Sequence, residues 1–246
     1  MGNTVPSLFA AAAGRDPSLP LVTFYDDESG ERAELSGATL ANWVAKTANL
    51  LVDGCGLGPG DQATVWLPPH WQSAAVLLGA WSAGLTVAYG EPTAAGADVE
   101  FASLAVVETG PPAGPPDRFV LGLAPMGMPL REVPPGWADF VADMRRHGDH
   151  FPGAPVGGDT VALLDPDGTA VTHAALVERA AARAAELGIA GGRVLLDADV
   201  YPWPVDWLLA PLAAGASLVL STHTDLAKLP ARAESEQAVQ IVGPTL

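Results

Sequence analysis

The sequence predicts an α/β protein in which a mostly parallel sheet is flanked by helices. Short apolar runs alternate with longer helix-like runs, and the short runs are continuously apolar rather than alternately apolar and polar. Continuous apolar strands are typical of parallel sheets that are covered on both faces. With 246 residues, of which 49% are hydrophobic, the chain has ample material for such a core.

The first clear element is an amphipathic helix at residues 36–52, for which Ser36 is a suitable N-cap. The glycine- and proline-rich residues 54–61 end this helix. Residues 70–83 are apolar almost all round, which predicts a helix that is covered on most sides. We also expect strands at residues 63–67, 85–89, 103–107 and 118–123 and a helix at residues 137–146.

The second half of the chain continues the alternation. We expect strands at residues 160–164, 193–198, 217–220 and 238–242 and helices at residues 173–187 and 205–213. Residues 110–116 and 147–158 are rich in proline and glycine, which predicts loops. We interpret residues 1–246 as a single α/β body with a soft internal boundary near residue 157. It separates a first run of strand–helix units (1–156) from a second (157–246).

The charge balance argues against several classes of partner. The chain has 12 basic and 28 acidic residues, which gives a formal net charge of −16. Binding to nucleic acid or to an anionic membrane requires clustered lysine and arginine, so neither partner is expected. The single cysteine, Cys55, excludes an internal disulfide and a cysteine-based zinc site, and we expect it to be an inert thiol.

The sequence shows no pattern for export or membrane insertion. The apolar patch at residues 8–13 has no basic segment before it and does not match a signal peptide. No apolar run approaches the roughly 20 residues that span a bilayer. We therefore expect a cytoplasmic protein.

Three blocks of sequence resemble one known family, in the same order along the chain. The first block is residues 35–92, with the loop GLGPGD at 56–61 and the helix end WSAG at 81–84. The second contains residues 158–164, which include the predicted strand at 160–164, followed by Thr172 and His173, and the third is residues 209–220. Together these blocks are similar to the first part of the N-terminal domain of adenylate-forming enzymes, a superfamily that includes the acyl-CoA synthetases.

The resemblance implies a phosphate-binding loop before the helix at residues 173–187. In the family this loop is rich in serine, threonine and glycine and carries a lysine. Here the position holds a short turn made of Asp165, Pro166, Asp167, Gly168 and Thr169. Proline at the second position of a turn and glycine at the fourth are typical of a tight type I turn.

Such a turn is a poor site for ATP. Two carboxylates without a cation would face a polyanion, and each pair of like charges about 5 Å apart costs about 3 kcal/mol at an effective dielectric constant of 20. The family's nucleotide, magnesium, hinge and C-terminal lysine motifs also have no counterpart here. We therefore expect no catalytic residue, no ATP or magnesium cofactor and no metal site, and the chain is interpreted as a truncated, degenerate family member.

An aromatic cluster is the best candidate for a ligand pocket. Tyr201, Trp203 and Trp207 correspond in position to the family loop that lines the acyl pocket. Thr172 and His173, at the start of a predicted helix, are assigned to the same candidate pocket. The aromatic residues fit a residual apolar pocket and a core or subunit contact equally well.

Two further pairs of polar residues are interpreted as structural. Asp197 and Asp199 follow a predicted strand, where carboxylates usually cap loops. His147 and His150 lack a third ligand, so a metal site is not expected there.

The functional hypothesis is an adenylation-like protein without adenylating activity that binds an apolar or acyl ligand or a protein partner. One alternative is an acyl-CoA synthetase-type enzyme half that needs a second polypeptide. Another is a homodimeric interaction protein, because a shortened domain would leave apolar surface that a second copy could cover.

Overall fold

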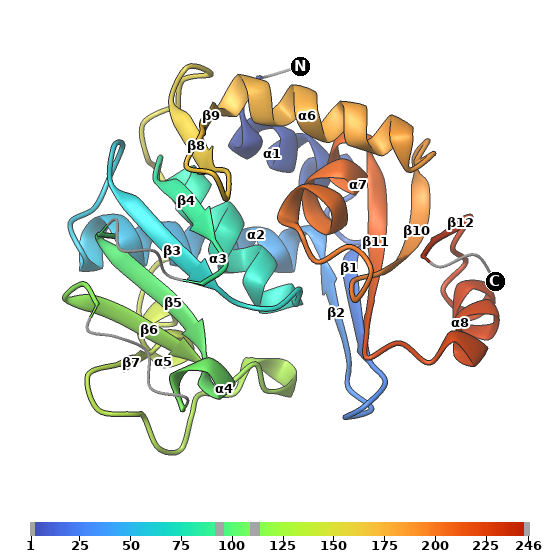
Figure 1. Ribbon diagram of the computed structural model, residues 1–246, viewed down its shortest axis with the longest axis horizontal. Helices are drawn as coiled ribbons and strands as arrows, with labels where there is room; N and C mark the ends of the chain where they lie inside the picture. The colour runs from blue at the N-terminus through green and yellow to red at the C-terminus, as the bar shows by residue number, and fades with distance from the viewer. Residues whose placement is uncertain (1–2, 92–95, 109–113, 244–246) are drawn as a thin grey trace.

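The computed structural model describes residues 3–91, 96–108 and 114–243, which form two sheets with helices between and around them (Figure 1). Within this part of the chain, sheet A has the strand order β12-β10-β11-β1-β2 and sheet B the order β7-β6-β5-β3-β4-β8-β9. Neighbouring described strands are parallel except in the hairpins β1–β2 and β8–β9. The predicted fold class, a mostly parallel sheet architecture flanked by helices, is therefore confirmed.

Sheet A joins the beginning of the chain to its end. Its strands are β1 (Pro20–Asp26), β2 (Arg32–Ser36), β10 (Gly192–Asp197), β11 (Ala216–Thr222) and β12 (Gln240–Val242). The helix α8 (Leu229–Ser235) packs on the outer face of this sheet, where its Leu229 contacts Leu195 and Val219 in a small apolar cluster (Figure 1).

Sheet B is built mainly from the middle of the chain. Its strands are β3 (Gln62–Trp66), β4 (Thr86–Tyr89), β5 (Val99–Ser103), β6 (Asp117–Leu121), β7 (Ala138–Asp139), β8 (Val161–Leu164) and β9 (Ala170–Thr172). The short helices α4 (Leu104–Val107) and α5 (Phe140–Met144) follow β5 and β7, and the 3₁₀ turn η2 (Pro125–Gly127) follows β6.

Two helices lie between the sheets and form the centre of the core (Figure 1). In α2 (Gly37–Asn49), the Ser36 hydroxyl accepts a hydrogen bond from the Thr39 N–H at 3.1 Å, so the predicted cap is confirmed. This helix continues into a π-helical turn, η1 (Leu50–Gly54). In α3 (Trp71–Ser82), residues 71–81 are all buried, as the apolar pattern predicts.

Three further helices, with η3, lie along the upper edge and one face of sheet A in Figure 1. They are α1 (Val5–Arg15), α6 (His173–Glu186) and α7 (Ala210–Ala213), which follows the π-helical η3 (Val205–Leu209). The 3₁₀ turn η4 (Leu226–Lys228) directly precedes α8. The predicted helices at 173–187 and 205–213 are thus present.

One predicted element is wrong in type, and a second is right only in part. The strand predicted at residues 103–107 instead ends at Ser103, and the helix α4 follows it. The strand itself was hidden because it contains Glu100, a residue uncommon in strands, whose buried carboxylate pairs with Arg118 at 3.0 Å. The helix predicted at 137–146 begins as strand β7, and Asp139 then caps α5 by accepting from the Ala142 N–H.

The structure also bears on the predicted loops and the boundary. Residues 147–158 contain no helix or strand, as predicted, whereas residues 110–113 of the other predicted loop lie outside the described residues. The boundary near residue 157 stays a prediction, and both sheets contain strands from each side of it. None of the helices in the described residues is long and apolar enough to traverse a bilayer.

Candidate functional site

The turn at the predicted phosphate-loop position is closed by its own hydrogen bonds. The Asp165 N–H donates to the Thr169 carbonyl at 3.0 Å, and the Gly168 N–H donates to the Asp165 carbonyl at 2.8 Å. The Thr169 N–H donates to the Asp167 carboxylate at 2.9 Å, and Pro166 has no N–H. Gly168 has a φ of +84°, which glycine adopts readily. Most backbone donors that could hold a phosphate are therefore already used.

A cation is present beside this turn, so the expectation of two carboxylates without a cation is wrong. Arg179 on α6 forms a two-pronged ion pair with Asp165, with Nη1–Oδ1 and Nη2–Oδ2 distances of 2.6 and 3.0 Å. The hydrogen bonds that Arg179 donates to the Asp165 carboxylate raise the pKa of Arg179. Such a bidentate pair matches the guanidinium to one carboxylate and leaves it less able to receive another anion.

The turn and the predicted aromatic cluster meet at a cleft of about 430 Å³ between the β8–β9 hairpin, α6 and η3. Its lining is Asp165, Arg179, Ala182, Arg183, Glu186, Trp203, Val205 and Asp206. Arg183 lies one helical turn after Arg179 and pairs with Asp206 at 2.7 Å and with Glu186 at 2.9 Å. The cleft thus contains two guanidiniums and three carboxylates, so its net charge is negative.

The aromatic residues of the cluster have different environments. Trp203 is half-buried, lines the cleft and packs edge-to-face against Tyr89, with ring centroids 5.6 Å apart. Tyr201 lies under the Arg183 guanidinium at 5.7 Å from its ring centroid. Trp207 is fully buried in the core. Of the three aromatic residues, Trp203 is therefore the one that a ligand in the cleft would touch.

Thr172 and His173 stabilise helix ends. The Thr172 hydroxyl caps α6 by accepting from the Ala175 N–H at 3.3 Å. His173 is fully buried, and its Nδ1 accepts from the Val5 N–H at 3.3 Å, which joins the start of α1 to the start of α6. Burial lowers the pKa of His173 to about 4, so the ring is neutral at pH 7. Neither residue lines the cleft, and the five-residue pocket stays a prediction.

The other candidate residues have structural contacts. The Asp197 carboxylate accepts from the Asp199 N–H and the Thr224 hydroxyl, and Asp199 accepts from the Thr224 N–H, so both cap loops as predicted. Burial raises the pKa of the Cys55 thiol to about 12, which disfavours the nucleophilic thiolate. In the part of the chain that the structure describes, no three His, Cys, Asp or Glu side chains are arranged to hold a metal ion.

The two arginines of the cleft were not predicted from the sequence. Arg179 and Arg183 are four residues apart in a helix that was predicted, so they share one helix face. That spacing, in a helix that follows a turn with two carboxylates, could have predicted two guanidiniums close to the turn. The partner Asp206 on η3 could not be found in this way, because its proximity depends on how α6 and η3 pack.

One relative places the chain in a family. A protein of Mycobacterium tuberculosis (strain ATCC 25618 / H37Rv), described as a TIGR03089 family protein, is 38% identical over 239 residues. The match covers 92% of this chain and 93% of the relative. The chain belongs to the TIGR03089 family. No protein-family model matches the sequence.

Solved structures show which fold this TIGR03089 family member has. It aligns with the N-terminal domain of FACL13 from Mycobacterium tuberculosis (TM-score 0.70, 15% identity), covering 97% of this chain and 62% of that one. It aligns with an acyl-CoA synthetase of Brucella canis (TM-score 0.74, 16% identity), covering 97% and 46%. A fatty acyl-adenylate ligase of L. pneumophila, solved with acyl adenylate and pyrophosphate, gives a TM-score of 0.71 at 12% identity, covering 98% and 44%.

These identities establish the fold alone, and the chain spans less than two thirds of each of these solved chains. As a statement about the fold, the resemblance to the N-terminal domain of adenylate-forming enzymes is confirmed.

Proposed function

We propose that this TIGR03089 family protein has the adenylate-forming fold without adenylating activity, and that it binds an uncharged acyl or apolar ligand in the cleft beside Trp203. The observation that carries the proposal is the ion pair between Asp165 and Arg179 at the position of the family's phosphate loop.

Electrostatics opposes a triphosphate in this cleft. The carboxylates of Asp165, Glu186 and Asp206 outnumber the guanidiniums of Arg179 and Arg183, and both guanidiniums are already paired. At an effective dielectric constant of 20, each carboxylate about 5 Å from a phosphate costs about 3 kcal/mol. Binding ATP would also require the self-bonded turn at residues 165–169 to open. A nucleotide is therefore disfavoured in both charge and geometry.

The cleft retains one apolar side on which a ligand could pack. Trp203, Val205 and Ala182 line it, and Trp203 is held by its contact with Tyr89. A cleft of about 430 Å³ lies in the range that small-molecule sites occupy. An uncharged acyl group would gain the apolar contact without placing a negative charge beside three carboxylates.

The first test concerns ATP. Purified protein with Mg-ATP and a panel of carboxylic acids should release no pyrophosphate above the blank, and Mg-ATP should not shift the melting temperature. A low-micromolar Kd for ATP would contradict the proposal. Pyrophosphate release that appears only with a second polypeptide would favour an enzyme half instead.

The second test concerns binding of an uncharged acyl ligand beside Trp203. Titration calorimetry with octanoyl-N-acetylcysteamine, an uncharged acyl thioester, should show binding that Trp203→Ala weakens at least tenfold. Leu226→Ala, an exposed apolar residue away from the cleft, is the matched control and should bind as the parent does. Equal affinities of the parent and Trp203→Ala would exclude the cleft as the binding site.

A further inference from the structure

A groove of about 500 Å³ lies between α1 and α2, is lined mostly by apolar side chains and shares no lining residue with the cleft. Phe9, Ala13, Val44 and Ala45 are buried along it, and Phe151 contributes to its wall. We propose that this groove binds the alkyl chain of a single-chain amphiphile whose head group is an amine.

Small residues on both helices create the groove. At one end α1 and α2 touch, because a Cβ on Gly37 would lie 2.6 Å from the Ala13 carbonyl oxygen. Beyond this contact, Ala10 and Ala41 line the groove and have only a methyl group each with which to fill it. A small part of the apolar surface of Phe9 and Val44 therefore lies at the bottom of a groove of ligand size.

The wall opposite the helices is fixed by hydrogen bonds. Asn49, itself 6% exposed, donates to the carbonyls of Gly148 and His150, both at 2.9 Å. Lys46 donates to the His147 carbonyl at 2.6 Å. The segment that leads into Phe151 is thus attached to α2 without a ligand. A preformed wall lowers the entropic cost of binding.

The charge at the groove selects the head group. Among its described lining residues, Asp149 is the acidic side chain, His150 is the other titratable residue, and no lysine or arginine is present. A fatty-acid carboxylate would be repelled by Asp149, whereas an ammonium group would be attracted. The ligand class therefore differs from the carboxylate that acyl-activating enzymes adenylate.

Chain length gives the most direct test. Alkylamines of 8 to 14 carbons, used below their micellar concentrations, should displace Nile red from the protein. Each added methylene should tighten binding about fourfold until the groove is full, since burying one methylene contributes about 0.8 kcal/mol. Affinity that is independent of chain length would overturn the proposal.

The head group is tested with dodecylamine and dodecanoate at low ionic strength and pH 7.5. Dodecylamine should bind several-fold more tightly, and Asp149→Asn should remove that preference while keeping the chain-length dependence. Asp53→Asn changes the net charge equally at an exposed site outside the groove and should keep the preference. A preference that survives Asp149→Asn would count against the assignment.

Substitutions that fill the groove with a larger side chain test whether the groove is the binding site. Ala41→Phe should weaken dodecylamine binding at least tenfold, whereas Ala185→Phe on the exposed face of α6 should have no effect. If Ala41→Phe does not fold, Ala38→Trp at an exposed lining position serves instead. Undiminished binding would overturn the proposal, and so would a dimer that these substitutions dissociate, since a second copy would then occupy the groove. Trp203→Ala should leave binding unchanged, which separates this site from the cleft.

Discussion

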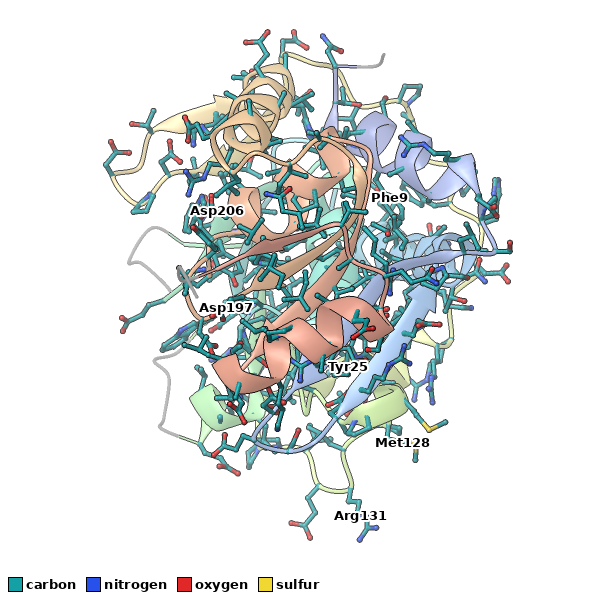
Figure 2. The ribbon with its side chains drawn as sticks, turned by 90° about the vertical axis from the view of Figure 1, so that its right-hand side faces the viewer. Phe9, Tyr25, Met128, Arg131, Asp197 and Asp206 are labelled. Atoms are coloured by element: carbon teal, nitrogen blue, oxygen red, sulfur yellow. The ribbon has the colours of Figure 1, made fainter. Side chains whose placement is uncertain are left out.

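At the residue scale, Arg232 is a strong example of a charge held in the interior. It is 8% exposed, and its guanidinium donates to Ser221 at 2.6 Å and to the Asp27 carboxylate at 2.7 Å. It also lies 4.2 Å above the ring of Tyr25, which Figure 2 shows beside α8. Burial by itself would raise the pKa of Asp27, but hydrogen bonds from Arg232 and the Asp225 N–H lower it to about 2.

Replacing Arg232 with methionine should therefore be costly. The Asp27 carboxylate would remain buried with only the Lys228 ammonium, 3.0 Å away, as a charged partner, so we expect a loss of about 3 kcal/mol in the free energy of unfolding. Urea denaturation measures this loss. Arg146→Met removes an exposed ion pair with Asp143 and should cost at most about 1 kcal/mol. Similar losses in the two variants would contradict the reasoning.

His173 gives a prediction about pH. Its pKa is lowered from 6.5 to about 4 in the folded state, so between these values the unfolded chain binds more protons. Stability should therefore fall as the pH is lowered through this window, by about 2 kcal/mol between pH 7 and pH 5 from this residue. His173→Asn can still accept the Val5 N–H but does not titrate, and its urea midpoint should fall less over that range. Parallel midpoints for the two proteins would show that His173 does not titrate as inferred.

At the element scale, the close contact of α2 and α3 depends on a glycine. A Cβ on Gly79 would lie 2.5 Å from Cβ and Cγ2 of Thr47, closer than real side chains approach. We expect Gly79→Ala to destabilise the protein by about 2 kcal/mol through overpacking. A Cβ on Gly14 in α1 would have no atom within 4 Å, so Gly14→Ala should leave the free energy of unfolding unchanged or raise it by about 0.5 kcal/mol. Thermal unfolding of both variants checks the signs, and a stabilised Gly79→Ala would contradict the packing.

Sequence patterns predicted some of the helices and strands and missed others. The apolar runs predicted most strands of sheet B, and the positions of Pro166 and Gly168 predicted the β8–β9 turn. The helix α1 and the hairpin β1–β2 were not recognised. In β2, polar side chains such as Arg32 and Glu34 conceal the strand, and its pairing with β1 is what fixes it. The role of His173 was equally hidden, because it depends on contact with Val5, 168 residues away.

At the scale of the whole molecule, each of the two sheets contains strands from both halves of the chain. From the first half, β1 pairs with β11 over residues 22–26, and β2 is hydrogen-bonded to β1. From the second half, β8 adds to β4 at Val87 and Ala88, and β9 extends that edge. The buried contact of His173 with Val5 joins the two halves a third time. Folding of either sheet therefore needs residues from both sides of residue 157.

This arrangement predicts that the chain unfolds as one cooperative unit. Far-ultraviolet circular dichroism and tryptophan fluorescence should give coincident urea transitions, as expected of a two-state protein. Fragments 1–156 and 157–246, produced separately, should each lack a cooperative thermal transition, because each would expose unpaired strand edges and apolar helix faces. Mixed in equal amounts, the fragments should regain a transition at a lower temperature than the intact chain. A cooperative transition for fragment 1–156 alone would show that the first run of strand–helix units is an independent domain. The strands contributed by residues 157–246 would then not be required for its stability.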